Sequence, residues 1–280
     1  MSSQLASRFG RNSNVLRQNV PLTDEQLYRV APSIFANEKH ESRSSRYTYI
    51  PTIEVLTGLR KEGFLPFMVA QSRSRIEGKE DFTKHMLRLR KADQIAGAEA
   101  NEIILINSHD GTSSYQMLAG IFRFVCQNGM VAGDIVEDVR IPHRGDIVNN
   151  VIEAAYTIVD EFEPVQASIE LMKSTQLLLP ESRAFAEAAL SLKYDDPEDA
   201  PIESRQLLSG RRYEDRSGDN QNSLWGTFNK IQENMIKGGL HGRTKDGKRT
   251  STREVKGIDS NVKLNKALWI LADKMAELKN

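Results

Sequence analysis

Residues 84–90 read Lys84-His85-Met86-Leu87-Arg88-Leu89-Arg90. Leu87 and Leu89 alternate with two arginines, so an extended chain places the leucines on one face and the arginines on the other. This alternation predicts a β-strand within residues 82–95. The expected strand has one apolar face, which suits a core, and one positively charged face.

A second β-type run lies upstream at residues 64–76, and the charged segment 77–81 separates the two runs. Two such runs joined by a polar turn are typical of an antiparallel β-hairpin. Before the hairpin, residues 53–61 carry apolar side chains at helical spacing, and Gly63 follows where a C-terminal cap is expected. The N-terminal half therefore begins with a helix and a hairpin.

After the hairpin, residues 102–107 predict a third strand, and the polar segment 109–113 predicts a turn. The next apolar residues have a spacing that we interpret as one face of a helix, ended by Asn128-Gly129. They are Tyr115, Leu118, Ile121, Phe122 and Val125. The predicted order is therefore helix, hairpin, strand, helix.

The remaining sequence is mainly helical. Periodic apolar residues predict a long helix from Gly145-Asp146 that is kinked or restarted at Pro164, and further helices at 180–194, 224–235 and 264–275. We expect an α+β fold, with an N-terminal antiparallel hairpin or sheet packed by helices and a mainly helical C-terminal half. The expected divisions are an arm and short helix at 1–40, an α+β core at 41–194, an acidic or polar linker at 195–223 and a helical region with a basic loop at 224–280.

The composition limits the classes of protein to which the chain can belong. Its 280 residues are 39% hydrophobic, which is enough for a packed core, and no apolar run reaches the length of about 18 residues that a membrane span needs. No signal-peptide pattern occurs, so a cytoplasmic protein without membrane partners is expected. The single cysteine, Cys126, cannot form an internal disulfide. The 38 basic residues equal the 38 acidic ones, so any case for nucleic-acid binding must be local.

Two segments are locally basic. Residues 237–256 contain seven lysines or arginines against two acidic residues, together with four glycines that allow the backbone to approach a phosphate closely. The predicted hairpin and the aromatic segment before it add a cationic face and base-stacking rings. The candidate nucleic-acid-binding residues are Arg43, Arg46, Tyr47, Tyr49, Arg73, Arg75, Lys84, Arg88, Arg90, Lys237, Arg243, Lys245, Lys248, Arg249 and Arg253. The alternatives are ordinary surface ion pairs in the hairpin and a solvated, mobile loop at 237–256.

A second group of polar residues raises the possibility of acid-base chemistry, because histidine titrates near neutral pH and a carboxylate can orient it. These residues are His85, His109, Asp110, Arg123 and His143. The histidines are distant in sequence, and His109-Asp110-Gly111 is equally a turn. No zinc-type Cys/His spacing, P-loop, dinucleotide fingerprint or nucleophile elbow occurs, so the sequence predicts neither a metal nor a cofactor.

Six long motifs resemble those of the family called domain of unknown function 932. They read HESRSSRY at 40–47, KHMLRLR at 84–90, NSHDGTSSYQML at 107–118, FRFVCQNG at 122–129, IQENMIKGGL at 231–240 and KLNKALW at 263–269. The resemblance covers nearly the whole chain. It implies a protein of prophages, plasmids or other mobile elements, whose accessory proteins often handle DNA or host defences. It carries no catalytic residues.

These observations lead to three hypotheses of different classes. The first is a non-catalytic, single-stranded DNA-binding or annealing protein, possibly forming a homo-oligomer, because the predicted element order is similar to that of single-strand annealing proteins. The second is a protein-interaction module, such as an inhibitor of a host nuclease or restriction system. The third is an enzyme that uses the region of His109 and Asp110, which requires a third titratable group near them. We rank the enzyme last.

Overall fold

The structure is a computed structural model that describes residues 13–36, 49, 51–74, 78–92, 99–110, 113–123, 128–131, 139–141, 146–196, 199–210 and 222–279. The chain divides into two compact units. The first consists of Met1–Ile121 and Ile135–Phe162, and the second of Phe122–Asp134 and Glu163–Asn280. The chain therefore passes from one unit to the other after Ile121, after Asp134 and after Phe162.

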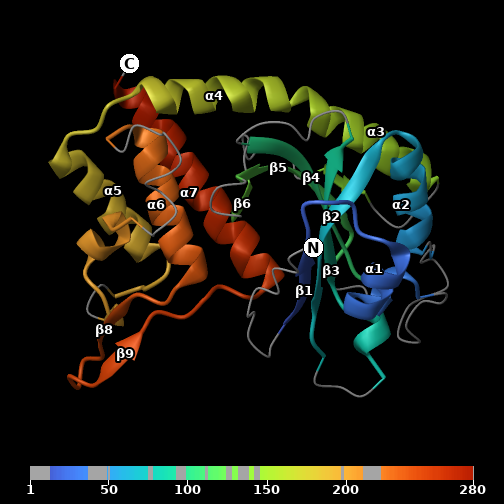
Figure 1. Ribbon diagram of the computed structural model, residues 1–280, viewed down its shortest axis with the longest axis horizontal. Helices are drawn as coiled ribbons and strands as arrows, with labels where there is room; N and C mark the ends of the chain where they lie inside the picture. The colour runs from blue at the N-terminus through green and yellow to red at the C-terminus, as the bar shows by residue number, and fades with distance from the viewer. Residues whose placement is uncertain are drawn as a thin grey trace, which may run out of the picture. The chain divides into compact units, whose positions relative to one another are not determined.

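The first unit is built on a β-sheet (Figure 1). Its strands lie in the order β1 (Ser13–Arg17), β2 (Phe64–Ser72), β3 (His85–Lys91), β4 (Glu99–Asn107) and β5 (Tyr115–Arg123), and β7 (Val139–Ile141) pairs with β5. The pairs β1–β2, β2–β3, β3–β4 and β5–β7 are antiparallel. The predicted hairpin and third strand are confirmed.

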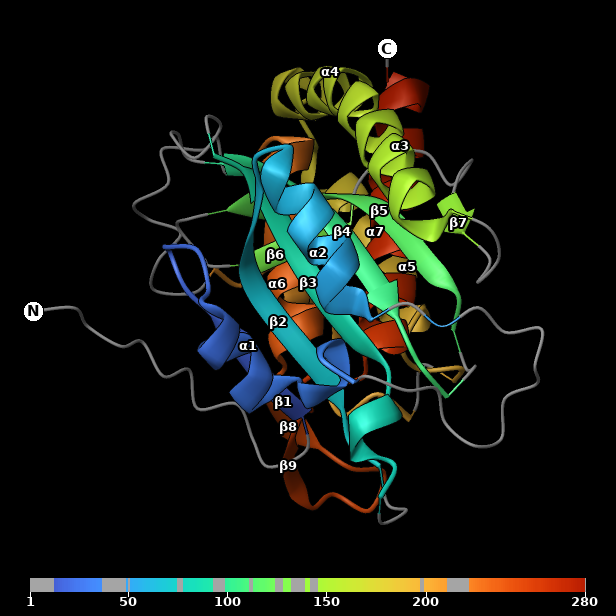
Figure 2. The same ribbon diagram turned by 90° about the vertical axis from the view of Figure 1, so that its right-hand side faces the viewer.

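Helices cover one face of this sheet (Figure 2). They are α1 (Asp24–Val30), the short 3-10 helix η1 (Pro32–Ile34), α2 (Thr52–Lys61) and α3 (Ile147–Asp160), and a second 3-10 helix, η2 (Glu80–Phe82), precedes β3. Thr23 caps α1 in a reciprocal capping box with Gln26. Gly63, with φ of 86°, allows the turn from α2 into β2, as its place in the sequence predicts.

The register of the sheet separates two faces. Val69 of β2, Leu87 of β3 and Leu105 of β4 lie opposite one another and belong to the core beneath the helices. One residue along, Met68, Arg88 and Ile104 form the corresponding row on the other face. The leucines and arginines of β3 therefore point to opposite faces, as the alternation predicts.

The helix predicted from Tyr115 is wrong, because this segment is strand β5. Its buried residues Tyr115, Met117 and Ala119 have a period of two and belong to the core beneath the helices. Leu118 and Phe122, which lie out of phase with them, are buried as well. When both faces of a strand are buried, the apolar run loses its alternation and mimics a helix. The element order on which the similarity to annealing proteins depended is therefore not present.

The second unit is mainly helical. Its helices are α4 (Phe162–Ser174), α5 (Leu179–Ser191), the 3-10 helix η5 (Ser204–Leu208), α6 (Leu224–Lys237) and α7 (Ile258–Lys279). Its strands are β6 (Asn128–Val131), β8 (His241–Arg243) and β9 (Arg249–Ser251). Pro164 lies in the first turn of α4, which confirms the predicted restart of the helix at this point.

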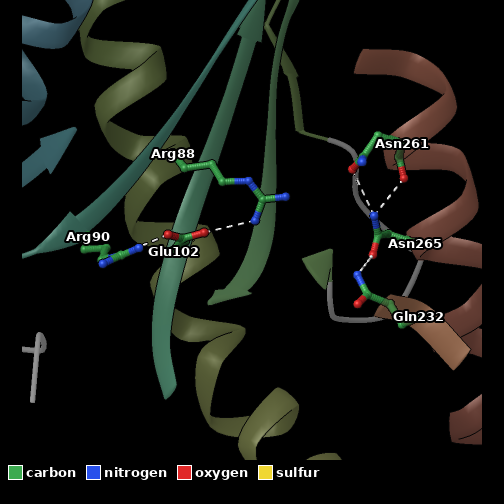
Figure 3. A network of polar contacts seen from close by, with 6 residues as sticks. All are labelled: Arg88, Arg90, Glu102, Gln232, Asn261 and Asn265. Carbon is green, nitrogen blue, oxygen red and sulfur yellow. Dashed lines mark hydrogen bonds and ion pairs between the residues drawn. The ribbon is translucent and has the colours of Figure 1, made fainter. Parts of the chain in front are cut away.

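Aromatic and amide contacts hold α6 and α7 together. Trp225 stacks on Phe228 with ring centroids 5.6 Å apart, and Phe228 meets Trp269 edge to face at 6.1 Å. Gln232 Nε2 donates to Asn265 Oδ1 at 2.7 Å (Figure 3). The two tryptophans are buried anchors of the helical core, as their apolar surroundings in the sequence indicate. Among the described residues, no helix is both long and apolar enough to cross a membrane.

Candidate nucleic-acid interface

The basic segment 237–256 forms an ordered β-hairpin in the second unit. Strands β8 and β9 pair antiparallel, with Arg243 opposite Arg249 and His241 opposite Ser251. All four of these side chains are exposed. Directly opposed residues of like charge repel each other across a strand pair, and this repulsion destabilises the pair. The register thus places two exposed arginines opposite each other, and Arg243 Nη1 also donates to the carbonyl of Gly247 at 2.8 Å.

The hairpin is docked on the chain segment that precedes η5. Arg243 N donates to the carbonyl of Pro201 at 2.8 Å, and Gln206 Nε2 donates to the carbonyl of His241 at 2.9 Å. At Gly242, a Cβ would lie 1.6 Å from that same Pro201 oxygen, so only glycine permits this approach. The segment is thus a hairpin bound to a neighbouring part of the chain, with charged side chains that are exposed to solvent.

The base of the hairpin is tied to helix α6. Lys193 Nζ donates to the carbonyl of Met235 at 3.1 Å and to that of Arg253 at 2.8 Å. Burial lowers the pKa of Lys193, because desolvation disfavours its charged form. Gly239 N donates to the Thr252 carbonyl at 2.7 Å. These bonds fix the position of the hairpin backbone that carries the exposed arginines.

Two of the predicted basic residues are engaged by carboxylates. Lys237 Nζ lies 2.6 Å from Glu233 Oε1, and Lys245 Nζ lies 2.6 Å from Asp199 Oδ1. The Asp199 carboxylate raises the pKa of Lys245. In the part of the chain that the structure describes, the other four predicted side chains of this segment are exposed and form no ion pair: Arg243, Lys248, Arg249 and Arg253.

The arginines of β3 are placed differently. Arg88 and Arg90 are buried, and both bind the buried carboxylate of Glu102 on β4, with N–O distances of 2.9 Å each (Figure 3). The guanidinium of Arg90 also lies 4.5 Å from the centroid of the Phe67 ring, within the range of a cation–π contact. The predicted cationic face is present, but these two arginines serve a buried ion-pair network.

The structure describes three of the other predicted nucleic-acid contacts, all in the first unit. Arg73 is exposed and Lys84 is half-buried. The hydroxyl of Tyr49 donates to the carbonyl of Ala36, and its ring lies edge-on to His109, so this tyrosine is used inside the first unit. The remaining predicted residues, Arg43, Arg46, Tyr47 and Arg75, lie outside the described residues.

The histidine region forms a buried polar cluster on the helix-covered face of the sheet. His85 and His109 are fully buried, with ring centroids 5.5 Å apart. The hydroxyl of Thr52, at the start of α2, lies 2.9 Å from His85 Nε2 and 3.3 Å from His109 Nε2. Burial, and next the proximity of His109, hold the pKa of His85 well below its usual value. A neutral histidine without solvent contact is suited to hydrogen bonding in a core.

The structure describes one further member of the predicted polar site. Asp110 follows His109 and is half-buried, with its backbone N–H bonded to the carbonyl of Phe82. His143 and the side chain of Arg123 lie outside the described part of the chain. Among the residues that the structure describes, no group of three His, Cys, Asp or Glu side chains could hold a metal ion.

Several members of these networks carry no recognisable signal in the sequence. Glu102 is the acidic partner of both β3 arginines, yet it reads as one polar residue at the start of a strand. Thr52 reads as a helix-start residue, and Asn107 as the end of a strand. They belong to networks because the fold brings together hydrogen-bonding partners that are 12 to 57 positions apart in the sequence. Only the alternation in β3 indicated in advance that its arginines share a face.

Comparisons with known proteins give a consistent result. The profile of the family described as "Domain of unknown function (DUF932)" matches residues 39–269. The chain is 52% identical to "UPF0380 protein YafZ" of Escherichia coli (strain K12) and 53% identical to "UPF0380 protein YfjQ" of the same strain, each over 97% of both chains. No solved structure matches it. The chain therefore belongs to the DUF932 family, as its motifs led us to expect.

Proposed function

We propose that this protein binds the phosphate backbone of nucleic acid through the β8–β9 hairpin, and that single-stranded DNA is its ligand. The observation that carries the proposal is the exposed pair Arg243 and Arg249, which lie directly opposite each other. Such a pair costs stability in the free protein, and two successive phosphates, one bound to each guanidinium group, replace that repulsion with charge-assisted hydrogen bonds.

The surroundings of this pair support the same ligand. Lys248 and Arg253 are exposed near the two arginines in sequence, and the backbone of the hairpin is held by bonds to Pro201 and Lys193. Preorganised cations lose little conformational entropy on binding. Among the described residues, neither Arg243 nor Arg249 forms an ion pair that must be broken first, although Arg243 Nη1 donates to the Gly247 carbonyl. Binding of this kind reads charge and spacing, so it is independent of base sequence.

The preference for a single strand follows from spacing. Opposed side chains on paired strands have Cβ atoms about 5 Å apart, and a flexible single strand can adjust successive phosphates to that separation. A duplex holds its phosphates at fixed positions. Annealing of two strands would require the protein to hold both, which a homo-oligomer with several hairpins would do.

The proposal is tested by fluorescence-anisotropy titration of a labelled single-stranded oligonucleotide at several salt concentrations. The double variant Arg243→Ala with Arg249→Ala is compared with Lys173→Ala with Lys274→Ala. The control removes the same net charge, but its lysines lie outside the hairpin and are already paired with Glu170 of α4 and Glu277 of α7. Loss of two phosphate contacts lowers the slope of log Kobs against log salt by about 1.4, at about 0.7 per contact on a single strand.

Equal affinities of the two double variants would contradict the proposal, and so would binding that is insensitive to salt. If the wild-type protein bound a duplex as tightly as a single strand, the proposed phosphate site would stand but the preference for a single strand would be wrong. Absence of binding at low salt would favour the rival hypothesis of a protein-interaction module, in which the same arginines meet acidic side chains of a host protein.

A further inference from the structure

In the hydrogen bonds around His85, the donor and the acceptor can be assigned bond by bond, because each assignment determines the next. The series of hydrogen bonds begins at Gln71. The backbone N–H of Ser33 can only donate, and it lies 3.1 Å from Gln71 Oε1, so this atom is an acceptor. Gln71 Nε2 donates to the carbonyl of Glu80 at 2.8 Å, which agrees with that orientation. The hydroxyl of Ser33, 2.7 Å from the same Oε1, must therefore donate to it.

The orientation of Ser33 determines the tautomer of His85. Because the single hydroxyl proton of Ser33 is used on Gln71, its oxygen accepts from His85 Nδ1, which lies 2.8 Å away. Nδ1 of His85 thus carries a proton. The carbonyl of Thr83, at 3.4 Å from the same nitrogen, agrees with this. In a neutral ring Nε2 is then an acceptor, and it receives the hydroxyl proton of Thr52 across 2.9 Å.

In this arrangement the Thr52 hydroxyl uses its donor and both of its acceptor positions. Its proton is donated to His85, and its oxygen accepts from Asn107 Nδ2 at 3.1 Å and from His109 Nε2 at 3.3 Å. The hydroxyl of Tyr115 is more distant, at 3.4 Å. A hydroxyl oxygen has two acceptor positions, so the two shorter contacts fill them. His109 then carries its proton on Nε2.

The amide of Asn107 is used on one side only. Its oxygen Oδ1 is buried, and no hydrogen-bond donor reaches it among the described residues. Leaving a buried carbonyl oxygen without a donor costs about 1–3 kcal/mol. A rotation of the amide by half a turn would bring Oδ1 to Thr52 and would place Nδ2 where Oδ1 had been, so one amide group is unpaired in either orientation. Thr52 would then donate to Asn107, and it would have no proton left for His85.

The rotated amide has one consequence for His85. Its Nδ1 still donates to Ser33, and its Nε2 now faces a hydroxyl that offers a lone pair, so Nε2 must also carry a proton. We infer that His85, Thr52 and Asn107 form a proton-operated switch, in which the amide of Asn107 rotates when His85 takes up a proton from solvent. Each hydrogen bond of Thr52 is kept in both states. The bond between Asn107 Oδ1 and Thr52 forms only in the cationic state.

The groups that face the switch decide the pH at which it operates. The titratable side chain that acts on His85 is His109, whose proximity opposes the cation. Tyr115 and Tyr49 border the cluster through Thr52 and His109. The acidic side chains on the surrounding elements, Glu54 of α2 and Glu80 and Asp81 of η2, are exposed, and Asp110 is half-buried. The positively charged ring therefore depends on hydroxyl and amide oxygens, and its pKa lies low.

The inference is tested by long-range proton–nitrogen NMR of the imidazole rings during an acid titration of the full chain. At neutral pH, His85 should show a protonated Nδ1 and a bare Nε2. On acidification both nitrogens become protonated while the backbone spectrum stays that of the folded protein. A protonated Nε2 with a bare Nδ1 at neutral pH would overturn the inference, as would unfolding that coincides with the titration of His85.

Two substitutions of Asn107 separate the switch from simple burial. Asn107→Asp offers Thr52 an acceptor in either orientation and a negative charge, so the proton affinity of His85 should rise about tenfold or more. Asn107→Leu removes the acceptor, so the proton affinity should fall about tenfold. Titration of His85 at the wild-type pH in the aspartate variant would overturn the inference even if the leucine variant fails to fold.

Discussion

Arg90 Nε lies 2.9 Å from Oε1 of Glu102, and neither side chain is exposed to solvent. Oε2 of the same carboxylate binds Arg88, so one acid serves two arginines inside the protein. Desolvation of buried ions is costly, and such a group is tolerated only when each charge has a partner of good geometry. This relationship explains why two arginines on one face of a strand do not form an open cationic surface.

Removal of the shared carboxylate should destabilise the protein strongly. Glu102→Gln keeps the size of the side chain but removes the negative charge that two buried guanidinium groups share, so the free energy of unfolding should fall by about 3–5 kcal/mol. Urea denaturation measures this loss. Glu170→Gln is the matched control, because its exposed pair with Lys173 contributes under about 1 kcal/mol. Similar losses in the two variants would contradict the prediction.

The stability of the folded chain should decrease in weak acid because of His85. The pKa of this histidine is held well below its usual value in the folded state, whereas the unfolded chain binds the proton near pH 6.5. The contribution to stability is therefore complete above about pH 6.5 and is lost as the pH falls toward the folded-state pKa. Urea denaturation between pH 7.5 and 5 measures the slope.

The variant His85→Gln should lose this part of the pH dependence while it is less stable at every pH. His241→Gln serves as the control, because it makes the same replacement at an exposed histidine of β8. A slope that His85→Gln does not alter would show that other groups bind the protons.

Gly242→Ala should displace the basic hairpin. The new Cβ would lie 1.6 Å from the carbonyl oxygen of Pro201, and a backbone atom cannot move aside as a flexible side chain can. We expect a loss of about 1–3 kcal/mol in stability, and weaker binding of single-stranded DNA than the wild-type protein shows. Gly257→Ala is the control, since its Cβ would meet Ser260 Oγ at an ordinary 3.4 Å. If Gly242→Ala bound single-stranded DNA as tightly as the wild-type protein, the position of the hairpin would not determine binding.

Lys193→Met should loosen the base of the hairpin. Methionine retains much of the aliphatic stem but leaves the carbonyls of Met235 and Arg253 without the ammonium donor. The expected loss is about 1–3 kcal/mol of unfolding free energy, with faster hydrogen exchange at the amides of β8 and β9. Lys274→Met, at an exposed pair with Glu277, should change neither measurement appreciably. Hydrogen exchange that stays at the wild-type rate in β8 and β9 would argue against this role.

Much of the fold follows from local patterns. The capping box at Thr23, the turn glycine Gly63 and the proline that restarts a helix at Pro164 act through neighbouring backbone, so the sequence indicates them directly. The alternation in β3 likewise predicts a strand with leucines and arginines on opposite faces. Strand β5 escaped prediction because both of its faces are buried, which removes the polar residues that mark a period of two.

The roles of the charged and polar side chains depended on contacts between residues far apart in the chain. The sequence by itself determined the family, the α+β class and the excess of basic residues at 237–256, because motifs, periodicities and composition are local. Only the tertiary structure decided that Arg88 and Arg90 share the carboxylate of Glu102, that Arg243 lies opposite Arg249, and that Thr52 joins two buried histidines. Burial and the geometry of hydrogen bonds exist only after distant segments pack together, and they determine what each charge can do.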